Sequence, residues 1–204
     1  EEEVRTSLLE KEALIKEIHH RVKNNMQIIS SLLELKKSKV TSEESISVIN
    51  DSKNRIKSMA LIHEKLYSSK NLANINLSEY IADLSNLLLY HYDLNKKVKI
   101  NLDLKNIQFD INAMVPIGLL LNELLTNSLK YAFNKSKNGN IFIKLESDDM
   151  IKFELTYSDD GPGLPKDFDI DDIKTLGFQL IKSLIYQLEG EYVIDSKKGF
   201  SIKI

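Results

Sequence analysis

Cysteine is absent from this sequence, and proline and glycine are scarce. The 204 residues contain no cysteine, 3 prolines and 7 glycines. The lack of cysteine excludes disulfides, thiol chemistry and cysteine-ligated zinc, and it fits a cytoplasmic location. The few prolines and glycines leave little room for flexible linkers.

The sequence also lacks a large excess of one charge and a long apolar run. Lysine and arginine total 28 against 30 acidic residues, which gives a net charge of −2. No overall field therefore recruits nucleic acid or an acidic membrane. No apolar run reaches the roughly 18 residues of a membrane span, so we expect no direct membrane insertion of this segment. The opening EEEV suggests a missing upstream region, which leaves open a membrane-tethered parent protein.

What the first half does contain is a helical pattern with a seven-residue period. We expect a helical hairpin over residues 1–70, which becomes a four-helix bundle if the chain forms a homodimer through it. A capping box at Thr41 and Glu44 predicts the start of the second helix. The apolar seams are expected at Leu8, Ile15, Val22 and Ile29, with Ile18 and Leu32 beside them, and at Ile49, Ile56 and His63.

The second half, residues 71–204, alternates helical and strand patterns. VKINLDL, NIFIKLES and MIKFELTYS alternate apolar and polar residues, as expected of strands with one buried face. A long helix is expected over residues 112–133, with Pro116 in its first turn. A later helix is expected to close at Gly190. The order predicts an α+β fold in which helices cover one face of a mixed sheet.

A row of polar side chains is expected on the helix over residues 112–133. Glu123, Asn127, Lys130 and Tyr131 are three or four residues apart and therefore share a face. Carboxylate and amide oxygens suit Mg²⁺, and the lysine ammonium suits phosphate. A solvent-facing polar stripe has the same spacing, so the spacing alone leaves both interpretations open.

Two glycine-containing segments follow the polar row. Asp159, Gly161 and Gly163 end a strand, where the glycines allow close approach of a flat ligand and Asp159 can accept a hydrogen bond from an exocyclic amine. Gly177 opens a helix and exposes backbone N–H groups to an anion. An acidic turn and a plain helix N-terminus explain each segment equally well in isolation. The order of the three segments is the specific signal.

In this order the segments resemble the ATP-binding domain of the GHKL superfamily, which includes gyrase and histidine kinases, over about residues 76–204. The resemblance implies a Bergerat-type α/β sandwich that binds ATP and Mg²⁺. It implies that Asn127 ligates Mg²⁺, with Glu123 as a possible second ligand, and that Asp159 binds the adenine amine. The remaining nucleotide-binding candidates are Lys130, Tyr131, Gly161, Gly163 and Gly177. The sequence departs from the family pattern in a short lid, in Leu-Gly-Phe-Gln at the second glycine box, and in Phe200 where threonine is usual.

The stretch EIHHRVKNNMQII, residues 17–29, carries two adjacent histidines. On the expected seam His20 points to solvent, while His19 lies about 100° around the helix. A shared metal is unfavourable because adjacent helical histidines diverge and no acid completes a ligand set. A nucleic-acid patch needs more basic and aromatic residues. A structural histidine remains an alternative, more so for His19 than for His20.

The whole stretch resembles the acceptor helix of sensor histidine kinases with an H-R-x-K-N box, over about residues 8–67. The resemblance implies that His20 accepts the phosphoryl group, beside Arg21, Lys23 and Asn24. The general base stays unassigned between Glu17 and Glu123. The chain is thus predicted to phosphorylate itself from Mg-ATP and to pass the group to the receiver domain of a response regulator. A GHKL ATPase or serine kinase without phosphohistidine, and a pseudokinase scaffold, are the alternatives.

Overall fold

The computed structural model describes residues 2–68, 77–94, 97–105, 111–133, 138–147, 152–164 and 176–204. It divides the chain into two compact units, Glu1–Leu72 and Ala73–Ile204. The first unit is helical, and the second holds the sheet.

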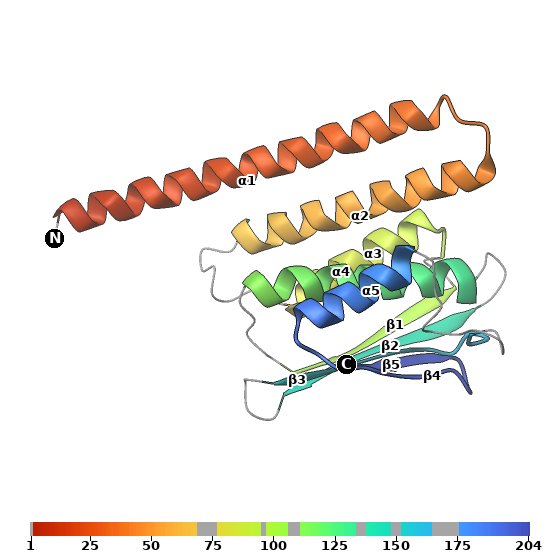
Figure 1. Cartoon of the computed structure of the whole chain (residues 1–204). Helices are drawn as coiled ribbons and strands as arrows, with labels where there is room; N and C mark the ends of the chain where they lie inside the picture. The colour runs from red at the N-terminus through yellow and green to blue at the C-terminus, as the bar shows by residue number, and fades with distance from the viewer. Residues whose placement is uncertain are drawn as a thin grey trace. The chain divides into compact units, whose positions relative to one another are not determined.

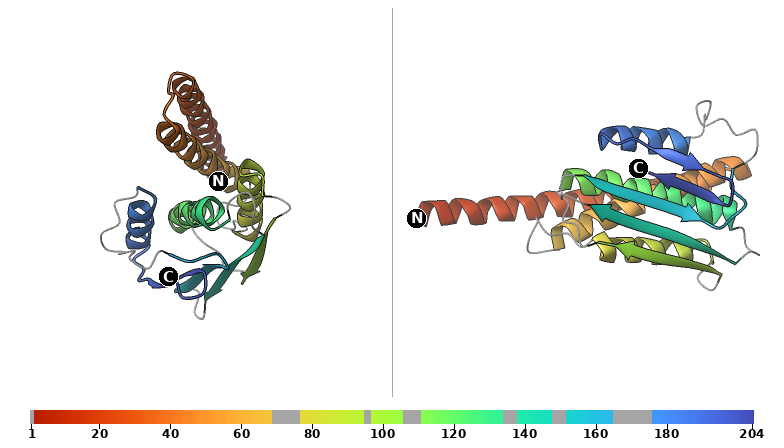
Figure 2. Two further views of the ribbon diagram at one scale, coloured as in Figure 1. Left: turned by 90° about the vertical axis from the view of Figure 1, so that its right-hand side faces the viewer. Right: turned by 90° about the horizontal axis from the view of Figure 1, so that it is seen from below.

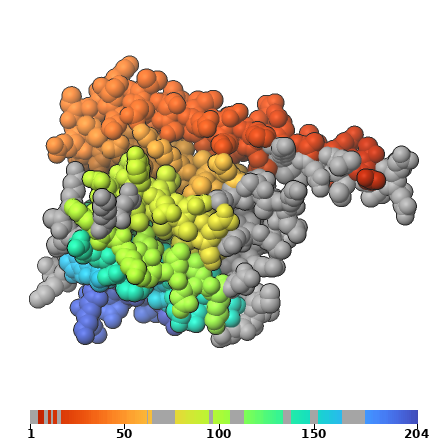
Figure 3. Space-filling view, turned by 180° about the vertical axis from the view of Figure 1, so that it is seen from behind, coloured from red at the N-terminus to blue at the C-terminus, as the bar shows by residue number. Residues whose placement is uncertain are grey.

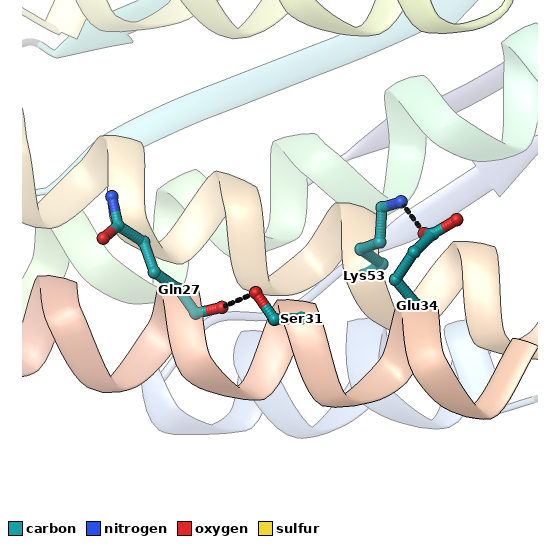
Figure 4. A network of polar contacts seen from close by, with 4 residues as sticks. All are labelled: Gln27, Ser31, Glu34 and Lys53. Atoms are coloured by element: carbon teal, nitrogen blue, oxygen red, sulfur yellow. Dashed lines mark hydrogen bonds and ion pairs between the residues drawn. The ribbon is translucent and has the colours of Figure 1, made fainter.

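The first unit is a hairpin of two long helices (Figure 1). Helix α1 spans Glu2–Lys37 and helix α2 spans Glu43–Ser68. Their side chains touch near the turn (Figure 3). An ion pair between Lys53 and Glu34 joins the two helices there, while Ser31 bonds back to the Gln27 carbonyl within α1 (Figure 4).

The N-cap of α2 differs from the expected capping box. The Ser45 N–H donates to Ser42 Oγ at 3.4 Å, and the Ile46 N–H donates to the Ser42 carbonyl at 3.0 Å. Ser42 is therefore the capping residue, and the prediction of Thr41 was off by one position. Both residues have a hydroxyl that can cap, so their side chains alone do not distinguish them.

The predicted seam of α1 is only partly buried in the hairpin. Val22 is half-buried, but Ile29, Ile18 and Leu32 are 46%, 54% and 56% exposed. The half-buried face of α1 in the described residues combines Val22 with four residues outside the predicted seam, namely His19, Met26, Ser30 and Leu33. The middle of that face lies roughly 60° around the helix from the middle of the predicted seam, and the two overlap at Val22.

In its described residues, the second unit is a five-stranded mixed sheet with three helices on one face, as predicted (Figure 2). The strands are β1 (Val98–Leu104), β2 (Gly139–Ser147), β3 (Phe153–Asp159), β4 (Val193–Asp195) and β5 (Phe200–Lys203), in the order β1-β2-β3-β5-β4. Strands β1 and β2 are parallel, and the other neighbours are antiparallel. Helix α4 (Ile111–Asn127) lies between α3 (Leu77–His91) and α5 (Leu176–Gln187).

The core of this unit lies between the sheet and the helices. In β2 the side chains of Ile141, Ile143 and Leu145 are buried while Phe142 and Lys144 are exposed, which confirms the predicted alternation. Helix α4 and the turn that follows it contribute four apolar residues to this core. These are Ile117, Leu121, Leu125 and Leu129, each no more than 1% exposed.

Three helix details differ from the predictions. The α-helix stops at Asn127 and continues as a π-helical turn, η1 (Ser128–Ala132), which ends with the Phe133 N–H on the Ser128 carbonyl at 2.9 Å. Pro116 lies in the second turn because α4 begins at Ile111. At the end of α5 the left-handed residue is Glu189, with φ 54°, and not Gly190.

None of the described helices is both long enough and apolar enough to cross a bilayer.

Candidate functional site

The polar row predicted on one helix is split by the π-turn. Glu123 is 2% exposed and accepts a hydrogen bond from the Asn122 amide at 3.2 Å, so it is not part of a solvent-facing stripe. Asn127 and Lys130 are half-buried, while Tyr131 is 68% exposed with the Lys130 ammonium 5.4 Å from its ring centre. The π-turn adds a residue to the turn and shifts the phase of everything after Asn127.

The same turn brings Ser128 against the strand-end aspartate. Asp159 ends β3 and is 4% exposed. The Ser128 hydroxyl donates to Asp159 Oδ2 at 2.5 Å, and the Gly161 N–H donates to Oδ1 at 3.0 Å. Both carboxylate oxygens are thereby oriented, and each keeps a further lone pair for a ligand.

The neighbouring aspartate has a different role. Asp160 accepts hydrogen bonds from the backbone N–H of Asn140 at 2.7 Å and from its side-chain amide at 2.8 Å. It is exposed and clamps the start of β2 to the end of β3. The two adjacent carboxylates thus differ in their partners: Asp160 connects strands β2 and β3, whereas Asp159 lies buried beside η1.

Glycines allow the backbone to close around Asp159. A Cβ on Gly161 would lie 2.4 Å from the Ala132 Cβ, so this glycine permits contact between the β3 loop and η1. Gly163 has φ +75° and packs against the Ser196 carbonyl. Gly199 has φ +87°, and a Cβ there would lie 2.0 Å from the Asp159 carbonyl oxygen. The last two positions require glycine both for space and for their backbone conformation.

The third predicted segment reaches the site through aromatic contacts. Gly177 is the second residue of α5 and is half-buried. The ring of the next residue, Phe178, meets Phe200 edge-on at 6.4 Å, and Phe200 pairs with Asp159 in the β3–β5 register. The fold therefore links all three segments within one unit. The lid positions 165–175 lie outside the described residues.

The described residues contain no cluster of three or more histidine, cysteine or acidic side chains that could hold a metal ion by themselves. Asn127 and Glu123 offer oxygen atoms, which suit a hard cation such as Mg²⁺. Mg²⁺ characteristically keeps few protein ligands and takes the rest from water and phosphate oxygens, so a site with few protein ligands fits this ion when it arrives with a nucleotide.

In the first unit, His20 is exposed on α1, as the sequence predicts. Both neighbouring cations have acidic partners. Arg21 Nε lies 2.8 Å from Glu17 Oε1, and Lys23 Nζ lies 3.2 Å from Glu64 Oε2 of α2. These exposed pairs are weak in water, so the cations can exchange partners. Asn24 is exposed one turn further along.

His19 contacts α2 instead of solvent. Its ring lies 5.7 Å from that of His63, centre to centre. Burial, followed by the nearby charges of His63 and His20, lowers the pKa of His19, and burial lowers the pKa of His63. The two adjacent histidines therefore differ: one packs across the hairpin, and the other is available to a reactant.

Sequence reasoning missed several residues around Asp159. Ser128, Gly199 and Asn140 gave no local signal, because each acts on a residue distant in the chain. Tyr157 offered a weak one, since a tyrosine at an inward position of a strand needs a partner for its hydroxyl.

Comparison with known proteins adds independent evidence. A family model described as histidine kinase matches residues 17–92, and a model described as histidine kinase-, DNA gyrase B- and HSP90-like ATPase matches residues 114–204. The sensor histidine kinase PdtaS of Mycolicibacterium smegmatis is 30% identical over 186 residues, which cover 90% of this chain and 37% of the relative. This chain belongs to the histidine kinase family.

Further relatives agree with this assignment. The blue-light-activated histidine kinase 2 of Erythrobacter litoralis is 25% identical over 179 residues, or 86% of this chain and 51% of the relative. A solved histidine kinase domain from a blue-light-activated kinase of the same organism has the same fold, with a TM-score of 0.67, 23% identity, and coverage of 96% of this chain and 90% of that one. The chain spans between about a third and a half of the curated relatives it matches.

These findings confirm the prediction of a histidine kinase core with a GHKL-type ATP-binding domain, and they support its use of ATP. They do not favour the alternatives of a serine kinase, a plain ATPase or a scaffold.

Proposed function

We propose that this histidine kinase core phosphorylates His20 from Mg-ATP and passes the group to an aspartate of a response regulator. The observation that carries the proposal is the exposed imidazole of His20 within the segment that matches the histidine kinase model. A neutral imidazole has a lone pair on one ring nitrogen, and this lone pair can attack the γ-phosphorus. A nitrogen–phosphorus bond forms as the bond from the γ-phosphorus to the β–γ bridging oxygen breaks, and ADP leaves with that electron pair.

The placement of the nucleotide-site residues supports the following roles. Asp159 accepts a hydrogen bond from the adenine amine. Gly161, Gly163 and Gly177 have no side chains, so the backbone at these positions can lie close to the nucleotide. Lys130 and Tyr131 lie within the π-turn η1, where the lysine charge can meet phosphate. Bound Mg²⁺ would neutralise charge on the phosphate oxygens, with Asn127 and the buried Glu123 as its candidate protein ligands. Arg21, Lys23 and Asn24 would interact with the phosphoryl group on arrival.

Labelled ATP tests the transfer directly. We expect the wild-type chain to acquire an acid-labile label, and His20→Gln to acquire none. His19→Gln is the matched control, because it removes the adjacent imidazole that packs on His63 and should retain labelling. Asp159→Asn should abolish labelling through loss of ATP binding. An acid-stable label, or a label that survives His20→Gln, would contradict the proposal in favour of a serine kinase.

The family also implies a dimer, and we infer that a second copy covers Ile18 and Ile29, two apolar residues that α2 leaves exposed. Ile18 and Ile29 lie on the predicted seam yet are 54% and 46% exposed, as expected if the sequence seam serves both α2 and a partner helix. Ile29→Glu should convert a dimer to a monomer in light scattering, whereas Leu102→Glu, on an exposed leucine of β1, should not. A wild-type monomer at micromolar concentration would refute the dimer.

The receiver domain is expected beside His20. A groove on α1 is lined by Asn24, Gln27, Ile28, Ser31, Leu32 and Leu35, and it runs along the helix from His20 at steps of three to four residues. A receiver that takes the phosphoryl group from His20 must dock next to it. Ser31→Arg should therefore slow transfer to the receiver but leave self-phosphorylation intact. The exposed Ser45 provides the control variant Ser45→Arg, and equal rates for both variants would contradict this docking site.

A further inference from the structure

A chain of buried hydroxyl groups leads to Asp159 from the core of the second unit. The Tyr157 hydroxyl lies 2.8 Å from Ser128 Oγ and 3.1 Å from the Leu124 carbonyl oxygen. Ser128 Oγ lies 2.5 Å from Asp159 Oδ2. Tyr157, Ser128 and Asp159 are 0%, 3% and 4% exposed.

The chemistry of the groups fixes the direction of this chain. An ionised carboxylate only accepts hydrogen bonds, so the single hydroxyl proton of Ser128 must go to Asp159. The Ser128 oxygen is then free to accept from Tyr157, whose proton can be shared with the Leu124 carbonyl. The donors therefore run from Tyr157 to Ser128 to Asp159. Burial raises the pKa of Tyr157 well above its ordinary value, which keeps the tyrosine protonated as a donor.

The two donors on Asp159 restrain its carboxylate plane. The Gly161 N–H holds Oδ1 at 3.0 Å, and Ser128 holds Oδ2. Without Ser128 the carboxylate could rotate about its Cβ–Cγ bond, and an exocyclic amine of a base would meet a less defined acceptor. An oriented carboxylate oxygen also repels the carbonyl oxygen that guanine carries in place of the adenine amine.

We propose that Ser128 and Tyr157 are positioning residues that set the selectivity of Asp159 for adenine. This inference rests on the proposed nucleotide site at Asp159. Neither residue needs to touch the nucleotide, since Ser128 acts through the carboxylate and Tyr157 acts through Ser128. The opposing explanation is that the hydroxyls only satisfy one another in the core, in which case they contribute to stability without affecting the base.

A nucleotide that lacks the amine separates these explanations. The affinities of the full chain for ADP, GDP and purine riboside diphosphate are measured by calorimetry with Mg²⁺. A hydrogen bond to a charged group contributes enough for a roughly tenfold effect, so we expect Ser128→Ala to weaken ADP about tenfold and to change purine riboside diphosphate little. Tyr157→Phe should weaken ADP by about threefold, since it removes an indirect contact. The preference for ADP over GDP should fall in both variants.

Two controls come from the same unit. Ser85→Ala removes another buried serine hydroxyl, and Tyr80→Phe removes another buried tyrosine hydroxyl, which bonds to the Gly118 carbonyl at 3.4 Å. Both should leave the ADP-to-GDP preference unchanged. Thermal midpoints of all variants establish that each is folded at the temperature of the titration.

The double variant tests the order of the chain. If Tyr157 acts through Ser128, then Tyr157→Phe adds no further loss of ADP affinity once Ser128 is alanine. Equal losses for ADP and the amine-free nucleotide, or fully additive losses in the double variant, would overturn the proposal. The variant Asp159→Asn tests the proposed nucleotide site separately from the proposed positioning role. If it leaves ADP binding intact, the nucleotide site itself is wrong; if it abolishes binding while Ser128→Ala has no effect, only the positioning role is wrong.

Discussion

Substituting Gly199 by alanine should destabilise the second unit and disturb the site at Asp159. Gly199 has φ +87°, where a residue with a side chain costs roughly 1–2 kcal/mol. Its Cβ would lie 2.0 Å from the Asp159 carbonyl oxygen, which is backbone and cannot rotate away. Forcing such an overlap typically costs about 1–3 kcal/mol. The two terms together predict a loss of roughly 2–5 kcal/mol.

Near-ultraviolet circular dichroism during heating measures this loss in the relevant unit. Of the 8 tyrosines, only Tyr67 precedes residue 73, so the tyrosine signal reports mainly the second unit. At about 3 °C per kcal/mol, the midpoint of Gly199→Ala should fall by about 6–15 °C. ADP affinity should fall as well, because the displaced carbonyl belongs to Asp159.

Gly190→Ala is the matched control in the same unit. A Cβ at Gly190 would meet the Ile204 and Ile185 methyl groups at 3.4 and 3.5 Å, which is ordinary contact, and its φ is not positive. Its midpoint should stay the same or rise slightly, since alanine restricts the unfolded chain. If Gly199→Ala were no less stable than Gly190→Ala, the argument from close backbone approach would be refuted.

Three further predictions concern charged groups. The pKa values of His19 and His63 are lowered in the folded hairpin. The hairpin is therefore fully stable above the pKa of unfolded histidine, near 6.5, and loses stability as the pH falls from there toward the folded pKa values. His63→Gln should make the thermal midpoint depend less on pH between pH 8 and pH 5. Asp160→Asn should lower the midpoint of the second unit but keep ADP affinity in calorimetry, because that carboxylate bonds to Asn140. A hydrogen bond from Lys53, and then the charge of Lys53, lower the pKa of Glu34. The stability that this pair contributes should therefore be lost as the pH falls through the pKa of Glu34 in the folded state, and also in high salt and in Glu34→Gln. Helical circular dichroism measures each loss.

The period-two and seven-residue patterns predicted the elements well because burial has a simple period. The inward residues of β2 follow directly from this period. The orientation of the hairpin seam could not be predicted in the same way. An apolar stripe that is wide enough to contact two neighbouring helices does not show which helix packs on which half of the stripe. His19 and Met26 face α2, while Ile18 and Ile29 stay exposed.

The candidate site was predictable where a residue acts through its own type and position. Asp159 at a strand end and the glycines after it have such a signal. The π-turn after Asn127 has none, since the i and i+4 spacing that predicts an α-helix is the same on either side of it. Yet this turn moves Ser128 to the carboxylate of Asp159, so the detail that sequence periodicity could not resolve is also the one that shapes the site.

Two departures from the expected family pattern are physically connected. Phe200 stands where threonine is usual, and Phe178 belongs to the altered second glycine box. Their rings meet at 6.4 Å, and Phe200 also lies 6.5 Å from the ring of Tyr157. A threonine side chain at position 200 is too short to make these ring contacts. Phe178 therefore has a ring partner only because position 200 is also aromatic. The three rings join β3, β5 and α5 beside Asp159, and the same Tyr157 sends its hydroxyl toward Ser128. The departures are therefore better understood as one packed cluster supporting the carboxylate than as separate losses from a nucleotide site.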